Sequence, residues 1–152
     1  MIQIEKENYK FSVDIEKTKE YYNTHSLCDC VCCRNYYEQI ANELPKLKEF
    51  LTDFGVDISK PDEIMSVEND GYIDYINVDY TVCGNIINSP EQKIKINDNI
   101  PLNIIITEGF ASPNEQTGDY FTLSVVNIRL PWVLDIPYPQ KINLKAENKK
   151  IV

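Results

Sequence analysis

A change in the spacing of apolar residues near Gly71 constrains the fold of this chain more than any other feature. Before Gly71, apolar side chains recur every three or four positions, which indicates a helix with one buried stripe: Cys33, Tyr37, Ile40, Leu44, Leu47, Leu51 and Phe54. After it the spacing becomes two, as in a strand with one buried face: Ile76, Val78, Tyr80 and Val82. A helical part followed by a strand-rich part predicts an α+β domain.

The helical stripe contains one proline, Pro45, which should kink or split a helix. The stripe keeps its phase across Pro45, so we expect one kinked helix of about six turns that ends at Gly55. Upstream, residues 9–15 alternate as a half-buried strand does, and residues 16–22 predict a short helical turn. A further helical turn is predicted over residues 59–64, where a serine can cap and acidic residues follow.

The second half of the chain predicts an antiparallel meander of about four to six strands, against which the kinked helix packs. Two alternating segments, 92–96 and 102–106, are separated by short connections rich in turn residues. A longer loop over 108–119 precedes the last long strand, at 120–130. We expect a single domain over residues 1–152, since this length suits one domain with its own core.

The charge of the chain restricts its partners. Its formal net charge is −9 and its pI is near 4.6, which argues against nucleic acid or an anionic membrane as a partner. A basic protein partner would suit this acidic surface. The only basic cluster, which we interpret as a solvated segment, consists of Lys141, Lys145, Lys149 and Lys150.

The cellular compartment affects how the cysteines are interpreted. Charged residues within the first eleven positions preclude the apolar region of a signal peptide, and no stretch approaches about 18 apolar residues. We therefore expect a cytoplasmic protein. Thiols are kept reduced there, so clustered cysteines favour metal binding or redox activity over a disulfide framework.

Residues 24–35, "THSLCDCVCCRN", hold four of the five cysteines and the only histidine of the chain. The cysteine- and histidine-rich loop, at about 25–33, has the spacing H-x2-C-x-C-x2-C. Three thiolates and one imidazole suit a closed tetrahedral zinc site, and the four predicted ligands are His25, Cys28, Cys30 and Cys33. The last of these lies where the helix begins, and a helix N-terminus favours thiolate over thiol.

Several alternatives to this ligand set stay open. Cys32 could replace Cys30 or Cys33 without breaking any spacing rule, and Cys83 could take the place of the histidine. Cys33 also lies on the apolar stripe, where it could simply be a buried hydrophobic residue. Behind the ligands, Arg34 could offset thiolate charge and Asn35 could offer a hydrogen bond.

A closed zinc site has no open coordination position, so we expect a non-enzymatic binding or interaction module rather than an enzyme. The leading alternative is a thiol redox or metal-sensing protein that uses the same cysteines, through Cys30 and Cys33 at the start of the helix. A cysteine–histidine nucleophile is less favoured, because no third residue that would orient the base is evident in the sequence.

Three segments resemble an uncharacterised family of small bacterial proteins that share an H-x2-C-x-C-x2-C-x-N-aromatic motif. These segments are "HSLCDCVCCRNYY" (25–37), "FLTDFGVDISKPDEI" (50–64) and "LPWVLD" (130–135). The resemblance implies a ligand set that matches the motif position by position: His25, Cys28, Cys30 and Cys33, followed by Asn35 and Tyr36 as the polar and aromatic members. It implies no activity, substrate or partner.

Overall fold

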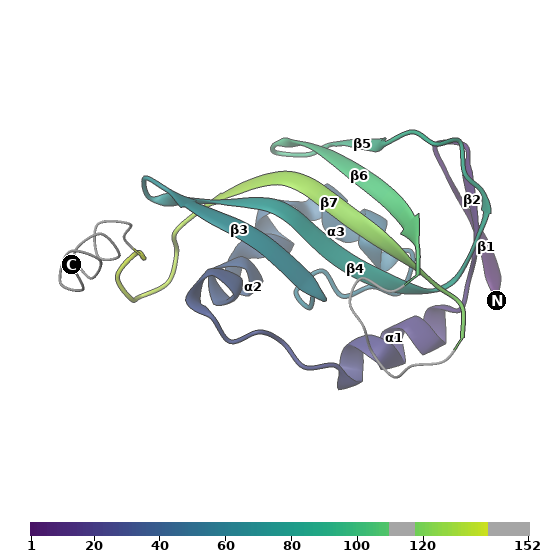
Figure 1. The fold of residues 1–152 in the computed structure, drawn as a ribbon, viewed down its shortest axis with the longest axis horizontal. Coiled ribbons are helices and arrows are strands. Elements are labelled where there is room, and N and C mark those ends of the chain that lie inside the picture. The colour runs from purple at the N-terminus through teal and green to yellow at the C-terminus, as the bar shows by residue number, and fades with distance from the viewer. Residues whose placement is uncertain (110–117, 140–152) are drawn as a thin grey trace, which may run out of the picture.

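The computed structural model describes residues 1–109 and 118–139, which form three helices and seven strands (Figure 1). In chain order these elements are β1 (Ile2–Lys6), β2 (Tyr9–Val13), α1 (Ile15–Thr24), α2 (Val31–Glu43), α3 (Pro45–Thr52), β3 (Glu63–Asn69), β4 (Tyr72–Asn88), β5 (Ile94–Asn97), β6 (Pro101–Glu108) and β7 (Tyr120–Pro131). Most of the loop predicted at 108–119 lies outside the described residues, as does the lysine cluster predicted to be solvated.

All strand pairs in the sheet are antiparallel, in the order β1-β2-β4-β7-β6-β5, and β3 pairs with β4. The long strand β4 contacts β3 and β2 along one edge and β7 along the other. Helices α2 and α3 lie behind the sheet in Figure 1. The predicted α+β class with an antiparallel sheet is confirmed, whereas the number of strands exceeds the expected four to six because β1 and β3 were not predicted.

A β-bulge in β4 changes which side chains of this strand face the core. Three members of the predicted face are fully buried, namely Val78, Tyr80 and Val82, but Ile76 is 43% exposed. The register shifts at this point, since consecutive residues of β3 pair with Tyr75 and Asn77. Ile76 is therefore an extra residue, and Ile73 and Tyr75 take over the buried face before it.

The predicted kinked helix is in fact two helices. Leu44 separates α2 from α3 with φ −126° and ψ 72°, outside the helical region, and Pro45 occupies the first position of α3. Proline suits this position, because its missing N–H would have no helical partner there. The buried stripe continues through the break, and α3 is followed by Gly55 at φ +83°, near the predicted end of the helix.

The helical turn predicted over 59–64 is wrong, because β3 begins at Glu63. Ser59 does not cap a helix there. Its amide and hydroxyl both donate to the carboxylate of Asp57, at 3.0 Å and 2.7 Å, which closes a turn. Pairing with β4 then determines the conformation of residues 63–69, a long-range contact that local propensity does not predict.

The helices and the inner face of the sheet share one cluster of buried apolar side chains. Among its largest fully buried members are Phe11, Tyr36, Phe54 and Tyr80, which come from both halves of the chain. In the described part of the chain no helix has the length and apolar character that crossing a membrane requires.

Candidate metal centre

The centre is built on the first turn of α2. Cys30 is the N-cap residue, with extended backbone at φ −69° and ψ 157°, and its sulfur accepts a hydrogen bond from the Cys33 amide at 3.4 Å. The Cys30 carbonyl accepts from the Arg34 amide at 3.0 Å, which closes the first helical turn. The free amides and the dipole of a helix N-terminus favour negative charge nearby, which suits a group of metal-binding sulfurs at this position.

Three of the predicted ligands lie together. The sulfur atoms of Cys28, Cys30 and Cys33 are all within 4.8 Å of one another, a group that could hold a metal ion. Cys28 and Cys30 are exposed, whereas Cys33 is buried. The hydroxyl of Tyr37 donates to the Cys28 carbonyl at 2.9 Å, so the next turn of α2 anchors the loop that carries the first sulfur.

The separation of the sulfurs fits a thiolate-bound metal after a small closing movement. Zinc–sulfur bonds of about 2.3 Å in a tetrahedron place the sulfur atoms about 3.8 Å apart. The three sulfurs lie within 4.8 Å, and two of them are on the exposed side of the loop, where a movement of this size disturbs no core packing. Among the described residues, no fourth histidine, cysteine or acidic side chain joins this group.

The thiols of this group differ in acidity. The pKa of Cys28 is lowered from its usual value, first by a hydrogen bond from the backbone of Cys30 and then by the thiols of Cys30 and Cys33. The pKa of Cys33 is raised, mainly by burial and further by its hydrogen bonds to the other two sulfurs. In the absence of a metal, the exposed Cys28 is therefore more easily ionised than Cys33, which donates toward its neighbours.

The predicted fourth ligand, His25, lies apart from the three sulfurs, at the end of α1. Its ring stacks on Tyr21 and meets Tyr22 edge-on, with both ring centroids 5.2 Å away, and Nε2 is 3.9 Å from Oδ1 of Asp62. Both ring nitrogens are buried, and neither has a hydrogen-bond partner within the described residues. Such orphaned nitrogens are unusual in a folded protein, and the ligand role of His25 stays a prediction.

The two alternative ligands also lie outside the three-sulfur group. The thiol of Cys32 is buried and points toward Oε1 of Glu68 at 3.7 Å, and burial followed by this carboxylate raises its pKa to about 11. Cys83 is buried in β4 next to α1, where its amide donates to the Thr18 hydroxyl at 3.0 Å. Burial also raises the pKa of Cys83.

The two residues expected behind the ligands differ in their surroundings. Arg34 is exposed on α2. Asn35 is fully buried and makes three hydrogen bonds: its amide nitrogen donates to the Tyr75 hydroxyl and the Pro131 carbonyl, both at 3.1 Å, and its oxygen accepts from the Val133 amide at 2.9 Å. The Tyr75 hydroxyl in turn donates to the Cys32 carbonyl at 2.6 Å, so two hydrogen bonds through this hydroxyl connect Asn35 to the backbone of the cysteine segment.

Sequence reasoning missed the buried polar group around Asp62. This carboxylate accepts hydrogen bonds from the hydroxyl of Tyr21 at 2.6 Å and from the hydroxyl of Thr81, and its side chain is 3% exposed. The three residues come from α1, the segment before β3 and β4, so no local pattern identifies them as neighbours. The sequence did single out Asp62, but only as an acidic residue in the first turn of the helix that was predicted over 59–64.

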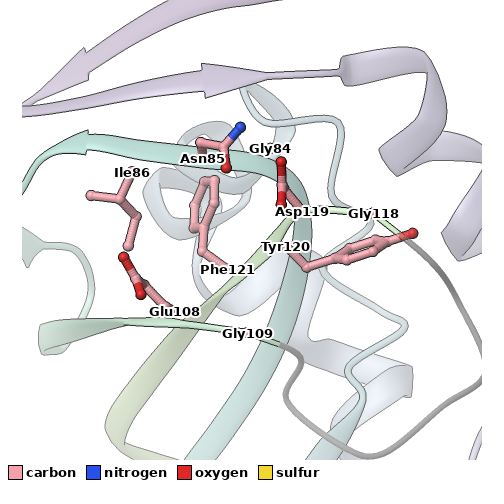
Figure 2. A pocket seen from close by; sticks show the side chains of 9 residues that line it. All are labelled: Gly84, Asn85, Ile86, Glu108, Gly109, Gly118, Asp119, Tyr120 and Phe121. Carbon is pink, nitrogen blue, oxygen red and sulfur yellow. The ribbon is translucent and has the colours of Figure 1, made fainter.

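Two hollows of the described surface, of about 450 Å³ and 480 Å³, lie away from the cysteines. One of them, about 450 Å³, opens at the end of β4 and β7 and carries the carboxylates of Glu108 and Asp119 with the ring of Tyr120 (Figure 2). None of the five cysteines lines it. It borders residues outside the described part of the chain, and it offers no group that would add to the chemistry of the three sulfurs.

Comparison with known proteins assigns no family to this geometry. No protein-family model, curated protein or solved structure matches the chain. The resemblance to the bacterial family with the H-x2-C-x-C-x2-C-x-N-aromatic motif stays a prediction from the motif.

Proposed function

We propose that this chain is a metal-binding interaction domain in which Cys28, Cys30 and Cys33 hold a structural Zn²⁺. The observation that carries this proposal is the grouping of three sulfurs within 4.8 Å at the start of a helix. Thiolates are the ligands that Zn²⁺ prefers in structural sites. The bound ion would fasten the loop after α1 to α2, so its binding free energy would add to folding stability.

His25 is the proposed fourth ligand. It lies three residues before Cys28, and its two buried nitrogens have no hydrogen-bond partner among the described residues. To reach the metal, its ring would leave Tyr21 and Tyr22 as the loop closes. A metal-bound histidine usually directs its other nitrogen to a carboxylate or carbonyl, and Asp62 is the carboxylate nearest to this ring. Cys32 and Cys83 are the alternative fourth ligands.

The proposed role is binding rather than catalysis, in the cytoplasm. Four protein ligands would leave no coordination position for a substrate. The formal charge of −9 favours a basic protein partner, because opposite charges speed and orient association. The metal would then stabilise the binding domain without taking part in a reaction.

Elemental mass spectrometry on tag-free protein, purified under reducing conditions, tests the site directly. We expect about one zinc per chain, and thiols at positions 28, 30 and 33 that react only after a chelator has removed it. Cys30→Ser should abolish retention of the metal, whereas Cys83→Ser, which removes a buried thiol outside the group, should retain it. Protein that contains no metal and does not bind added zinc would overturn the proposal.

The fourth ligand needs a separate experiment. His25→Ala should weaken zinc affinity by more than about 100-fold in competition with a coloured chelator, because losing a ligand costs more than losing a group that orients one, which typically costs about 10-fold to 100-fold. Asp62→Asn should produce a smaller loss if this carboxylate orients the ring. Unchanged affinity in His25→Ala would exclude His25 and direct the search to Cys32→Ser and Cys83→Ser.

One observation favours a second candidate function, thiol redox exchange or metal sensing. Cys28 and Cys30 are exposed, and Cys28 has a lowered pKa next to two other sulfurs. With oxidised glutathione as the oxidant, two thiols would lose two electrons and two protons to form a disulfide. Metal release would accompany this step, because a disulfide sulfur is a poor zinc ligand.

Titration of the metal-loaded protein in glutathione redox buffers separates the two functions. A structural site should keep its zinc across the potentials that the cytosol covers, because metal coordination protects the thiolates. A sensor should lose zinc and form a disulfide at a potential near that of the cytosolic glutathione pool. Zinc content and disulfide content are measured in the same samples.

A further inference from the structure

β3 has one free edge. Among the described residues it pairs with β4 alone. The turn between the two strands has positive φ at both central residues, Asp70 (46°) and Gly71 (87°), as in a two-residue type I′ hairpin. Asn69 and Tyr72 therefore form a hydrogen-bonded pair, and alternate residues of β3 before it direct their backbone groups away from β4. These residues are Ile64, Ser66 and Glu68, whose outward groups meet no other backbone in the described part of the chain.

Apolar side chains line the outer face of this edge. Met65 and Val67 are 60% and 39% exposed, and both project from the face of β3 that α2 does not cover (Figure 1). Val67 also lines the hollow of about 480 Å³ together with Ile76, which is 43% exposed, so apolar surface continues from the edge onto β4. An exposed apolar strand with unpaired backbone groups is a template for strand addition.

All charged side chains of the β3–β4 hairpin are acidic. They are Glu63, Glu68, Asp70, Asp74 and Asp79, and no lysine, arginine or histidine occurs from residue 61 to residue 92. Asp74 forms an ion pair with Arg129 of β7 at 2.6 Å, whereas Glu63 and Asp70 are exposed and have no ion pair with another described residue. Natural edge strands are often protected by lysine, which this edge lacks. Its charge therefore favours a basic occupant.

The same charge decides between the possible occupants. Pairing of β3 with a second copy would bring two acidic hairpins together, and like charges across paired strands are destabilising. Residues that face each other in paired strands project to the same side of the sheet. A segment with lysines opposite Glu63 and Glu68, and with apolar residues opposite the exposed Met65 and Val67, would instead form favourable cross-strand pairs.

We propose that β3 binds an extended segment of a basic protein, which adds to the sheet as an antiparallel strand. The backbone of this segment pairs with the outward groups of Ile64, Ser66 and Glu68. The inference rests on the proposed role of the chain as an interaction domain with a basic partner, and it assigns the surface that this partner contacts. Glu68 is 3.7 Å from the thiol of Cys32, but none of the three grouped sulfurs takes part, so the contact is independent of the metal.

A synthetic peptide tests this edge in the full, isotope-labelled chain. The probe is a backbone-cyclised hairpin whose free strand reads Thr-Lys-Val-Thr-Val-Thr-Lys, and the control peptide replaces both lysines by glutamate. In the proposed register the lysines lie opposite Glu68 and Glu63. The two valines lie opposite Val67 and Met65. At low ionic strength the lysine peptide, at saturation, should slow solvent exchange of the Ser66 amide at least about tenfold.

Nuclear Overhauser effects test the register. Residues of a non-hydrogen-bonded antiparallel pair bring their Cα atoms to about 4.5 Å. We therefore expect Hα–Hα effects from the valines of the lysine peptide to Met65 and Val67. The glutamate peptide should bind at least about tenfold more weakly, because its charges repel those of the hairpin.

Three results would overturn the proposal. The first is no binding of the lysine peptide at millimolar concentration, or binding that leaves residues 64–68 unchanged. The second is a Ser66 amide that is already protected in the dilute, peptide-free chain, since the edge would then be covered. The third is protection that appears with rising protein concentration alone, which would identify a second copy as the occupant. Binding of the peptide elsewhere would exclude this edge but keep the basic partner, and zinc content measured in the same samples tests the metal site separately.

Two pairs of matched variants give a second readout. Ser66→Pro removes an outward backbone donor and no hydrogen bond to β4, whereas Ser66→Ala keeps this donor. Affinity for the lysine peptide should fall at least about tenfold in the proline variant and stay within about twofold in the alanine variant. Glu63→Lys should weaken binding about threefold or more, whereas Glu49→Lys, the same charge change at an exposed position of α3, should stay within about twofold. Equal affinities within both pairs would contradict strand addition. The exchange rate of the Val78 amide, in the core strand β4, verifies that each variant is folded.

Discussion

The amide of Cys33 donates to the sulfur of Cys30 at 3.4 Å, across the first turn of α2. One sulfur therefore caps the helix and also belongs to the three-sulfur group. Helix caps usually use the oxygen of serine, threonine, aspartate or asparagine. A cysteine in this position joins the start of the helix to the donor set, so the two roles can be separated by substitution.

Serine and alanine at position 30 should separate capping from metal binding. Cys30→Ser retains a capping atom, so in chelator its free energy of unfolding should exceed that of Cys30→Ala by about 1 kcal/mol. Both variants should fail to retain zinc, because neither supplies a thiolate. Urea unfolding with chelator present, together with the metal content, measures the two effects. Equal unfolding midpoints for the two variants would show that the sulfur does not act as a cap.

Asn35 should be far more important for stability than its neighbour on α2. Asn35→Ala removes three hydrogen bonds of a fully buried side chain and leaves the amide of Val133 without its partner, while the Tyr75 hydroxyl keeps its bond to the Cys32 carbonyl. This should lower the free energy of unfolding by about 2 to 4 kcal/mol. The control is Arg34→Ala, an exposed residue on the same helix, which should change it by less than about 0.5 kcal/mol. Urea denaturation of both variants in chelator makes the comparison, and similar losses would contradict it.

Local spacing was sufficient to predict the parts of the site that local geometry determines. Cys30 and Cys33 are three residues apart at a helix start, and this separation places two side chains on the same face. The coarse fold was predicted on the same basis, since periods of about 3.6 and of two distinguish helices from strands. The approach of Cys28 was a weaker expectation, which depended on the loop curling toward the helix.

The parts that the sequence did not predict depend on contacts between distant segments. Asp62 acquires its partners from α1 and β4, and β3 becomes a strand because β4 lies beside it. Ile76 leaves its predicted face because the pairing of β4 with β3 shifts there, while the register of β4 with β7 is the same on both sides of Ile76. The break at Leu44 was missed because the apolar stripe continues through it and conceals the change of helix.

The hydroxyl of Tyr21 should contribute measurably to stability through Asp62. Tyr21→Phe removes the 2.6 Å hydrogen bond to this buried carboxylate while it keeps the ring on which His25 stacks. We expect a loss of about 1 to 2 kcal/mol in the free energy of unfolding, since a hydrogen bond to a charged group is stronger than a neutral one. Tyr72→Phe is the control and should have little effect, because this residue is 48% exposed at the sheet surface. Equal effects of the two substitutions would contradict a role for the Asp62 carboxylate.

The thiols of Cys28 and Cys32 should react at very different rates in the folded, metal-free chain. The pKa of Cys28 is lowered from 9.0, and that of Cys32 is raised to about 11 by burial and by Glu68. Two pKa units correspond to about a hundredfold difference in thiolate fraction at neutral pH, and burial slows Cys32 further. Alkylation with iodoacetamide at pH 7.5, followed by peptide mass spectrometry, should therefore modify Cys28 at least about a hundredfold faster.

The pH dependence of these two rates gives the same prediction a second form. The thiolate is the reactive species, so the rate at Cys28 should be half-maximal below pH 9, whereas the rate at Cys32 should keep rising about tenfold per pH unit until it approaches pH 11. In concentrated urea the environments that separate the two thiols are lost, and the rates should converge. If the rates were equal in the folded chain, neither the burial of Cys32 nor the hydrogen bonds around Cys28 would control their acidity.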